Sequence, residues 1–326
     1  MKPCGMRKTV SALLGMMIVA LFVASCGNRR AHEQSDESEC FNSIYHWKTV
    51  FAPNHAEMAF LKKHDIKRIY LKMFDVVVEN NHVMGTTEIV PVATTKFQAP
   101  IPKDVEVVPV TYVTLNALRA MQGREREFAA LIVERMLAMC SYNDCGVIRE
   151  VQIDCDWTAT TKDSYSLFCQ VAKDVLAAED LDLSITVRLH QLHETPPPAD
   201  RGVLMLYNTG ALKDLNTKNS ILDIHDAQPY IKEGRYPIPL DYAYPAFGWG
   251  IKFADQEFVS IVSEHDQPAA GEHIRVERPT AAEVMAVKQL VEEKLGKSSR
   301  GNILYHLDES QLKHYTHDQI SSILAY

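Results

Sequence analysis

Eight short β-rich runs, separated by segments with helical patterns, constrain this chain more than any other feature of its sequence. The runs are residues 43–50, 68–77, 105–114, 149–157, 183–190, 202–208, 239–245 and 302–307. Such alternation is typical of βα units around a parallel sheet. Because a (β/α)8 barrel needs about 250 residues, the eight runs predict a single α/β domain of TIM-barrel type over residues 43–326.

The segments between the runs support this prediction. Asn54, with Glu57 three residues later, predicts a capping box that opens a helix, and residues 165–176 carry a regular apolar helical stripe. Residues 80–102 and 247–279 break the alternation and are expected to be long loops at strand carboxyl ends. Residues 191–201 contain three consecutive prolines and are too short for a normal helix, so the barrel is expected to be irregular at its fifth connection. A doubly wound sheet is the main rival, but no glycine-rich phosphate loop follows the first run.

The amino terminus predicts export and lipid attachment. A basic start is followed by an apolar stretch over residues 10–23, too short for a comfortable membrane span. It ends in Val23-Ala24-Ser25-Cys26, which resembles the bacterial lipobox, with Cys26 as the acylated residue. The alternatives are an ordinary secretory signal and a short anchor. We therefore predict a signal peptide over residues 1–25, a lipidated cysteine and polar tether over residues 26–42, and a place in the bacterial cell envelope, attached to the membrane through the lipid alone.

Composition excludes several classes of protein. The chain of 326 residues is 46% hydrophobic and 23% charged, which is globular, and its formal net charge of −8 argues against a nucleic-acid partner. Cys155 and Cys169 are predicted to be neighbouring buried thiols, between the fourth strand and the following helix. Cys140 and Cys145 are close enough in sequence for a small-loop disulfide.

The fourth run places two carboxylates on one face of a strand. Side chains alternate across a strand, so Asp154 and Asp156 share a face opposite the apolar Val151, Ile153 and Cys155. If the apolar side faces the helices, both aspartates point into the barrel near its carboxyl end, where each raises the other's pKa. The structural alternative is that the pair bridges neighbouring strands through a cation such as Lys72.

Two motifs resemble those of known families. Asp154-Cys155-Asp156-Trp157 resembles the signature strand of the chitinase-like glycoside hydrolases, and Met205-Leu206-Tyr207-Asn208 resembles their sixth-strand motif. The whole chain is also similar to a family of uncharacterised bacterial barrel proteins, often lipoproteins, through Tyr45–Lys48, Phe74–Val76 and Val151–Asp156. That family brings no established reaction.

The resemblance to chitinases implies carbohydrate chemistry but departs from the pattern at the catalytic position. The acid that protonates the glycosidic oxygen is replaced here by Thr158, which cannot act as a general acid near neutral pH. A hydrolase would need another carboxyl, with Asp75, Asp241, Glu194 and Asp308 as candidates.

The predicted catalytic residues are Asp154 and Asp156, with Tyr207 orienting the sugar or stabilising developing charge. The predicted carbohydrate-binding residues lie near strand carboxyl ends, where flat aromatic rings stack on sugars and polar groups bind hydroxyls. They are Trp47, Asp75, Tyr112, His190, Asn208, Tyr244 and Trp249.

Three functional classes remain open: a glycoside hydrolase-like enzyme with a non-standard acid, a non-catalytic glycan-binding protein, and a structural envelope lipoprotein. The cluster His190, His193 and Glu194 raises a metal site as a further alternative, but its spacing lacks the helical His-Glu-x-x-His pattern. We therefore expect no metal and no cofactor.

Overall fold

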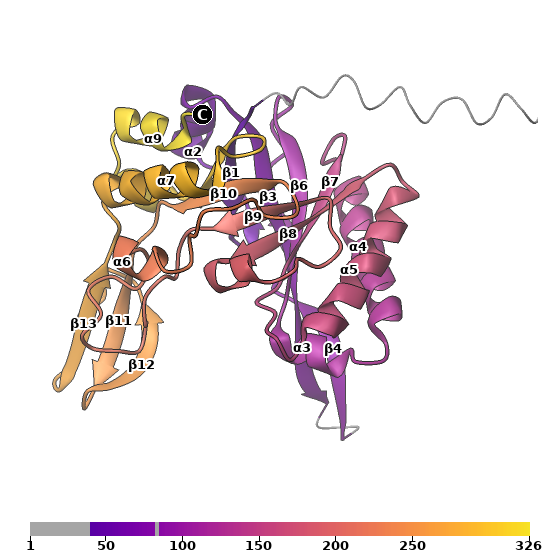
Figure 1. The fold of residues 1–326 in the computed structure, drawn as a ribbon, viewed down its shortest axis with the longest axis horizontal. Helices are drawn as coiled ribbons and strands as arrows, with labels where there is room; N and C mark the ends of the chain where they lie inside the picture. Colours follow the sequence, from indigo (N-terminus) through magenta and orange to yellow (C-terminus); the bar gives the residue numbers. More distant parts are fainter. Residues whose placement is uncertain (1–39, 82–84) are drawn as a thin grey trace, which may run out of the picture. The chain divides into compact units, whose positions relative to one another are not determined.

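The computed structural model describes residues 40–81 and 85–326, and within them eight parallel strands close into a barrel (Figure 1). Closure follows from β1, which pairs with both β14 and β3. In barrel order the strands are β1 (Asn42–His46), β3 (Ile66–Asn81), β6 (Glu106–Val113), β7 (Glu150–Asp154), β8 (Asp182–Arg188), β9 (Arg201–Met205), β10 (Leu240–Pro245) and β14 (Asn302–Tyr305). Each predicted run overlaps one barrel strand, so the prediction of a single TIM-like barrel is confirmed.

Helices cover the barrel unevenly. They are α2 (His55–Lys63), α3 (Leu115–Ala120), α4 (Glu125–Tyr142), α5 (Lys162–Ala177), α6 (Ile224–Ala227), α7 (Ala281–Leu295), α8 (Glu309–Leu312) and α9 (His317–Leu324). The predicted capping box is present, because Asn54 and Glu57 exchange hydrogen bonds at the start of α2. The fifth connection holds only the 3₁₀ helix η1 (Leu189–His193), as the proline run predicted.

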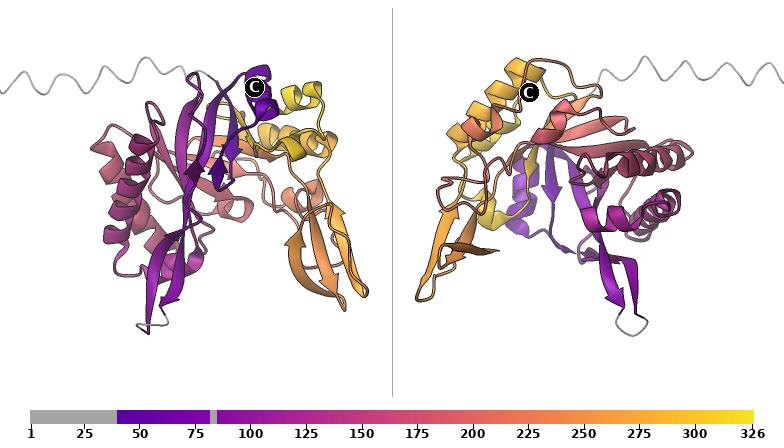
Figure 2. Two further views of the ribbon diagram at one scale, coloured as in Figure 1. Left: turned by 180° about the vertical axis from the view of Figure 1, so that it is seen from behind. Right: turned by 60° about the horizontal axis from the view of Figure 1, so that its bottom comes forward.

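The two stretches expected to be long loops are instead folded into antiparallel sheet, so that expectation is wrong. Strand β3 runs on and pairs with β4 (Thr86–Val92), and a three-stranded sheet of β11 (Trp249–Ala254), β12 (Glu257–Val262) and β13 (Glu272–Glu277) follows β10. The reason is local, because both stretches are rich in β-branched residues that suit strands. Both extensions project from the same end of the barrel, where the strand carboxyl ends lie (Figures 1 and 2).

A short parallel pairing of β2 (Val50–Phe51) with β5 (Lys96–Phe97) fastens the segment after β1 to the chain that follows the β3–β4 hairpin. It buries Phe51 against Phe97, with ring centroids 5.9 Å apart. This contact ties the first two barrel units together close to the barrel mouth.

Of the two predictions about the cysteines, one is correct and one is wrong. Cys155 faces α5, is buried with Cys169, and both remain free thiols whose pKa is raised by burial, as predicted for structural cysteines. Cys140 and Cys145 are also buried free thiols, so the small-loop disulfide is absent. The chain reverses between them through a hydrogen bond from the Cys145 amide to the Cys140 carbonyl.

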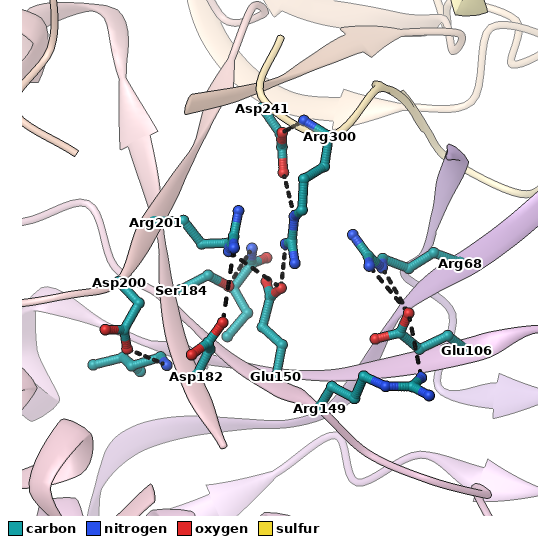
Figure 3. Close-up of polar contacts among 12 residues, drawn as sticks. Arg68, Glu106, Arg149, Glu150, Asp182, Ser184, Asp200, Arg201, Asp241 and Arg300 are labelled. Atoms are coloured by element: carbon teal, nitrogen blue, oxygen red, sulfur yellow. Dashed lines mark hydrogen bonds and ion pairs between the residues drawn. The ribbon is translucent and has the colours of Figure 1, made fainter. Parts of the chain in front are cut away.

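Ion pairs fill the amino-terminal end of the barrel (Figure 3). Arg300 binds Glu150 and lies 3.5 Å from Asp241, while Arg68 binds Glu106 at 3.0 Å. Glu150 is fully buried; burial favours its protonated form, but Arg300 and Arg68 hold the pKa of its carboxyl below the usual range. Charged side chains therefore fill the barrel interior at this end, and in barrels of this type ligands bind at the opposite, carboxyl end.

The predicted signal peptide, Cys26 and most of the tether lie outside the described residues. Among the helices of residues 40–81 and 85–326, none combines the length and apolarity needed to cross a bilayer.

Candidate functional site at the carboxyl end of the barrel

Three predicted site residues form a row across neighbouring strands. Asp75 on β3 is in register with Tyr112 on β6, and Tyr112 is in register with Asp154 on β7. Register partners in a sheet point to the same face. All three side chains therefore face the barrel interior near its carboxyl end, which is the orientation that the sequence predicted for Asp154.

Arg188, the last residue of β8, bridges the two aspartates. Its Nε donates to Asp156 at 2.5 Å and its Nη2 donates to Asp154 at 3.1 Å. Thr186, two residues earlier on the same face, donates a further hydrogen bond to Asp154 at 2.5 Å. The cation suggested from the sequence, Lys72, instead binds Asp75 at 2.7 Å, so that identification is wrong.

The alternation of β8 could have revealed Arg188. Ser184, Thr186 and Arg188 alternate with buried apolar residues, which is the pattern of an inward polar face. The bridge requires an Arg at this place, because its fork of donors reaches two carboxylates at once.

Asp154 and Asp156 lie in different environments. Asp154 is buried, with 4% of its side chain exposed, whereas Asp156 is 42% exposed. Burial raises the pKa of Asp154, the Arg188 guanidinium opposes the rise, and Asp156 adds to it. Asp156 also accepts a long hydrogen bond of 3.4 Å from the Tyr112 hydroxyl. Because Asp156 is the more exposed of the two aspartates, it is the carboxylate that a ligand can reach.

A pocket of about 260 Å³ opens beside Asp156. Tyr207 is almost fully buried at its edge, and the guanidinium of Arg188 lies 5.8 Å from the centre of the Tyr207 ring. The predicted residues His190 and Asn208 also line it. The complete lining is Asp156, Arg188, Leu189, His190, Tyr207, Asn208, Thr209 and Tyr230.

Aromatic rings continue from this pocket across the barrel mouth. The ring centroid of Trp47 lies 5.8 Å from that of Tyr305, Tyr305 lies 5.5 Å from Phe247, and Phe247 lies 5.3 Å from Trp249. Tyr207 joins the row through Tyr305, 4.8 Å away. Sequence reasoning missed Tyr305, although its place at the end of the eighth strand was a signal for it.

Tyr244 does not belong to the site, and its prediction is wrong. On β10 the residues Asp241 and Ala243 are in register with Val203 and Met205 on the inward face, which turns the tyrosines outward. Tyr242 donates to the carbonyl of Gly296 at the end of α7, and Tyr244 shares that outer face. Tyr244 points outward because side chains alternate along the strand. An aromatic residue near the end of a strand is therefore weak evidence that its side chain lies at the barrel mouth.

Each alternative acid considered from the sequence is already paired. Asp75 binds Lys72, Asp308 lies 3.1 Å from Lys48, and Glu194 binds Lys162 at 2.8 Å. Asp241 lies at the opposite end of the barrel with Arg300, so its candidacy is wrong. The Thr158 hydroxyl lies 3.0 Å from that of Thr160, in the turn before α5.

Two buried polar atoms at the mouth lack a hydrogen-bond partner in the described part of the chain. They are Nη1 of Arg188 and Oδ1 of Asp75. One is a donor and the other an acceptor, and buried polar groups are nearly always paired. Each atom could form one more hydrogen bond, but neither is exposed to solvent in this arrangement.

A metal site is not formed by the described residues, since nowhere among them do three His, Cys, Asp or Glu side chains gather closely enough. His190 lines the pocket beside Asp156, whereas His193 lines a separate cavity.

Two buried histidines next to the mouth predict acid sensitivity. Burial and the Lys48 ammonium lower the pKa of His46 to about 4, and burial lowers that of His306 to about 4. The unfolded chain, with histidine pKa values near 6.5, takes up these protons first, so stability falls as the pH drops from about 6.5 to 4. We expect a loss of up to about 1.4 kcal/mol per pH unit for each histidine.

Urea unfolding between pH 7 and pH 5 measures this slope. The variant His306→Asn should show a shallower slope than the wild type, while His55→Asn, on the exposed start of α2, should not change it. An unchanged slope in His306→Asn would show that its protonation is not linked to unfolding.

Comparison with known proteins supports the fold. No family model and no curated protein matches the sequence. Among solved structures, the GH18 chitinase ChiB of Flavobacterium johnsoniae aligns with a TM-score of 0.54 and 10% identity over 87% of this chain and 94% of that chain. A class V chitinase from Nicotiana tobaccum in complex with NAG4 aligns with a TM-score of 0.53 and 10% identity, covering 88% and 99%. The chain thus has a fold similar to that of chitinases, which confirms the distant resemblance.

Proposed function

We propose that the carboxyl end of the barrel binds carbohydrate, and that it does so without hydrolysing it. The observation that carries this proposal is the pocket at the barrel mouth, where the exposed carboxylate of Asp156 lies beside Arg188 and close to a row of four aromatic rings. Sugars present hydroxyls at their edges and apolar C–H faces, so they need both kinds of partner. The relative from Nicotiana tobaccum holds NAG4, which makes chitooligosaccharides the first ligands to test.

The pairing of the carboxylates favours binding over hydrolysis. A glycosidase needs two carboxyls with separate roles, one of them a protonated acid at the glycosidic oxygen. Here Arg188 holds both aspartates, and Thr158 stands where the resemblance places the acid. Asp75, Glu194 and Asp308 are each held by a lysine.

Hydrolysis is the second candidate, and one observation favours it. Asp154 is a carboxyl whose pKa is raised by burial, and it lies beside the more exposed Asp156, an arrangement that can separate an acid from a base. In a hydrolase of this kind Asp156 contacts the sugar, and Asp154 acts on Asp156 through Arg188, which binds both carboxylates.

A glycan array followed by product analysis separates the two functions. The purified protein should retain chitooligosaccharides on the array, and prolonged incubation should leave their chain length unchanged by mass spectrometry. Shortened products would establish hydrolysis. Retention of no glycan would leave the structural envelope protein as the remaining class.

We further propose that the protein is held in the bacterial cell envelope by a lipid on Cys26. The support is the sequence of residues 1–26 described above.

Replacing Cys26 with alanine should abolish lipid attachment, because the thiol is the atom that is acylated. Metabolic labelling with palmitate measures it, with Cys40→Ala as the control, since Cys40 lies near the far end of the predicted tether and outside the lipobox. Label that persists in Cys26→Ala, or is lost in Cys40→Ala, would contradict acylation at Cys26.

A further inference from the structure

Glu277 connects two parts of the candidate site, which are Trp249 in the aromatic row and the segment that carries Thr209 in the pocket. It ends β13 directly opposite Trp249, the first residue of β11, in the antiparallel register. Its carboxylate is completely buried, although both strands belong to a sheet that projects from the barrel. A buried charge is costly unless it is paired and hydrogen-bonded, so its partners reveal what it holds in place.

One oxygen of Glu277 accepts three hydrogen bonds. Oε2 accepts from Nε1 of Trp249 at 2.9 Å, from the backbone amide of Ser220 at 2.9 Å and from the Ser220 hydroxyl at 2.5 Å. The other oxygen accepts from Nε of Arg275 at 2.6 Å. The carboxylate is therefore saturated with donors from three places in the chain.

The bonds to Ser220 lead to the pocket. The Ser220 carbonyl accepts from the Gly210 amide at 3.2 Å, and the next carbonyl, of Ile221, accepts from the Thr209 amide at 3.4 Å. Thr209 lines the pocket beside Asp156. A Cβ at Gly210 would lie 3.1 Å from the Cα of Ser220, so the two segments are closely packed.

Arg275 strengthens the same connection. It donates to the carbonyls of Asp214 at 2.5 Å and Leu212 at 3.0 Å while its Nε is held by Glu277. The segment after the sixth strand is thus attached to the β11–β13 sheet both through Ser220 and through Arg275.

We propose that Glu277 is a positioning residue that fixes the indole of Trp249 and the pocket wall at Thr209 in one arrangement for the ligand. This inference rests on the proposed carbohydrate binding. Because Glu277 occupies the indole N–H, Trp249 has only its ring face to offer, and the matching part of the ligand is an apolar C–H face rather than a hydroxyl acceptor.

Glutamine cannot replace Glu277 in this role. One side of the carboxylate faces three donors and the other faces Arg275, so the NH₂ group of a glutamine must meet a donor on either side. An amide oxygen is also a weaker acceptor than a carboxylate oxygen, so Glu277→Gln should weaken the hydrogen bond to the indole in either orientation. Glu272→Gln is the matched control, because Glu272 lies on the same strand and binds Lys252 away from Trp249.

Two readouts test the inference on the purified full chain. With the tryptophans labelled with nitrogen-15, the protein has three indole signals, and Trp249→Phe identifies that of Trp249. Glu277→Gln should shift this signal and weaken binding of tetra-N-acetylchitotetraose by about tenfold, while Glu272→Gln should do neither. Melting temperatures of all variants report on the fold.

A double-mutant cycle separates positioning from a purely structural role. In the Trp249→Phe background the indole hydrogen bond is already gone, so Glu277→Gln should reduce affinity by a smaller factor than in the wild type. Equal factors in both backgrounds, or an unshifted Trp249 signal, would overturn the inference. If the wild type does not bind the tetrasaccharide while the Trp249 signal still shifts, the hydrogen bond stands and the proposed function is overturned, along with the role of Glu277 toward a ligand.

Discussion

Replacing Arg188 with methionine should lower the free energy of unfolding by about 3–5 kcal/mol and abolish glycan binding. The guanidinium is the cation that compensates Asp154, which has only 4% of its side chain exposed. Removing one partner of a buried ion pair leaves the other charge without compensation, and that cost is about 3–5 kcal/mol. Methionine keeps most of the volume and loses the charge. Urea unfolding and ligand titration measure the two effects.

Two further variants show whether the effect of Arg188→Met depends on the forked guanidinium and on its burial. Arg188→Lys keeps the charge but lacks the fork that reaches both aspartates, so we expect an intermediate loss of stability. Arg126→Met changes an exposed arginine on α4 and should stay within about 0.5 kcal/mol of the wild type. A loss below about 1 kcal/mol for Arg188→Met would mean that Asp154 does not need its cation.

Replacing Arg300 with methionine should destabilise the protein as much as Arg188→Met but leave glycan binding intact. Arg300 lies at the opposite end of the barrel, between the buried carboxylates of Glu150 and Asp241 (Figure 3). We expect a loss of about 3–5 kcal/mol in urea unfolding for the same physical reason.

Arg149 provides a control within the same cluster. Its side chain is 69% exposed and lies 4.0 Å from Glu106, so it forms a surface pair. Such pairs contribute about 0–1 kcal/mol, and Arg149→Met should be nearly neutral. If Arg300→Met and Arg149→Met lowered the free energy of unfolding equally, burial would not determine how much each ion pair contributes to stability.

The strands were predictable because each carries its own signal. Alternation placed Asp154 and Asp156 on an inward face without knowledge of any other strand. The same reasoning extended to Ser184, Thr186 and Arg188 would have found the bridging cation. Its failure at Tyr244 has a simple cause, since β10 has polar Asp241 on one face and two tyrosines on the other, and the sequence does not say which face is inside.

The sequence did not predict which residues far apart in the chain lie next to one another. Trp249 and Glu277 are separated by 28 positions, and only the register of β11 with β13 brings them together. The aromatic row likewise depends on barrel closure, which places Tyr305 of the last strand between Trp47 and Phe247. The two long stretches after the second and seventh strands showed β-branched residues, but not their partners.

The central claim is that Asp156 and its neighbours form a carbohydrate-binding site, and calorimetric titration of tetra-N-acetylchitotetraose into the wild type, Asp156→Asn and Asp104→Asn tests it most directly. Asp156 is exposed enough to contact a ligand, while Asp104 lies in an exposed turn at the other end of the barrel, before β6. We expect binding by the wild type and Asp104→Asn, and an affinity at least about tenfold lower for Asp156→Asn with little change in melting temperature. Equal affinity in all three proteins, or a loss of affinity accompanied by unfolding of Asp156→Asn, would contradict the assignment of this carboxylate to the ligand.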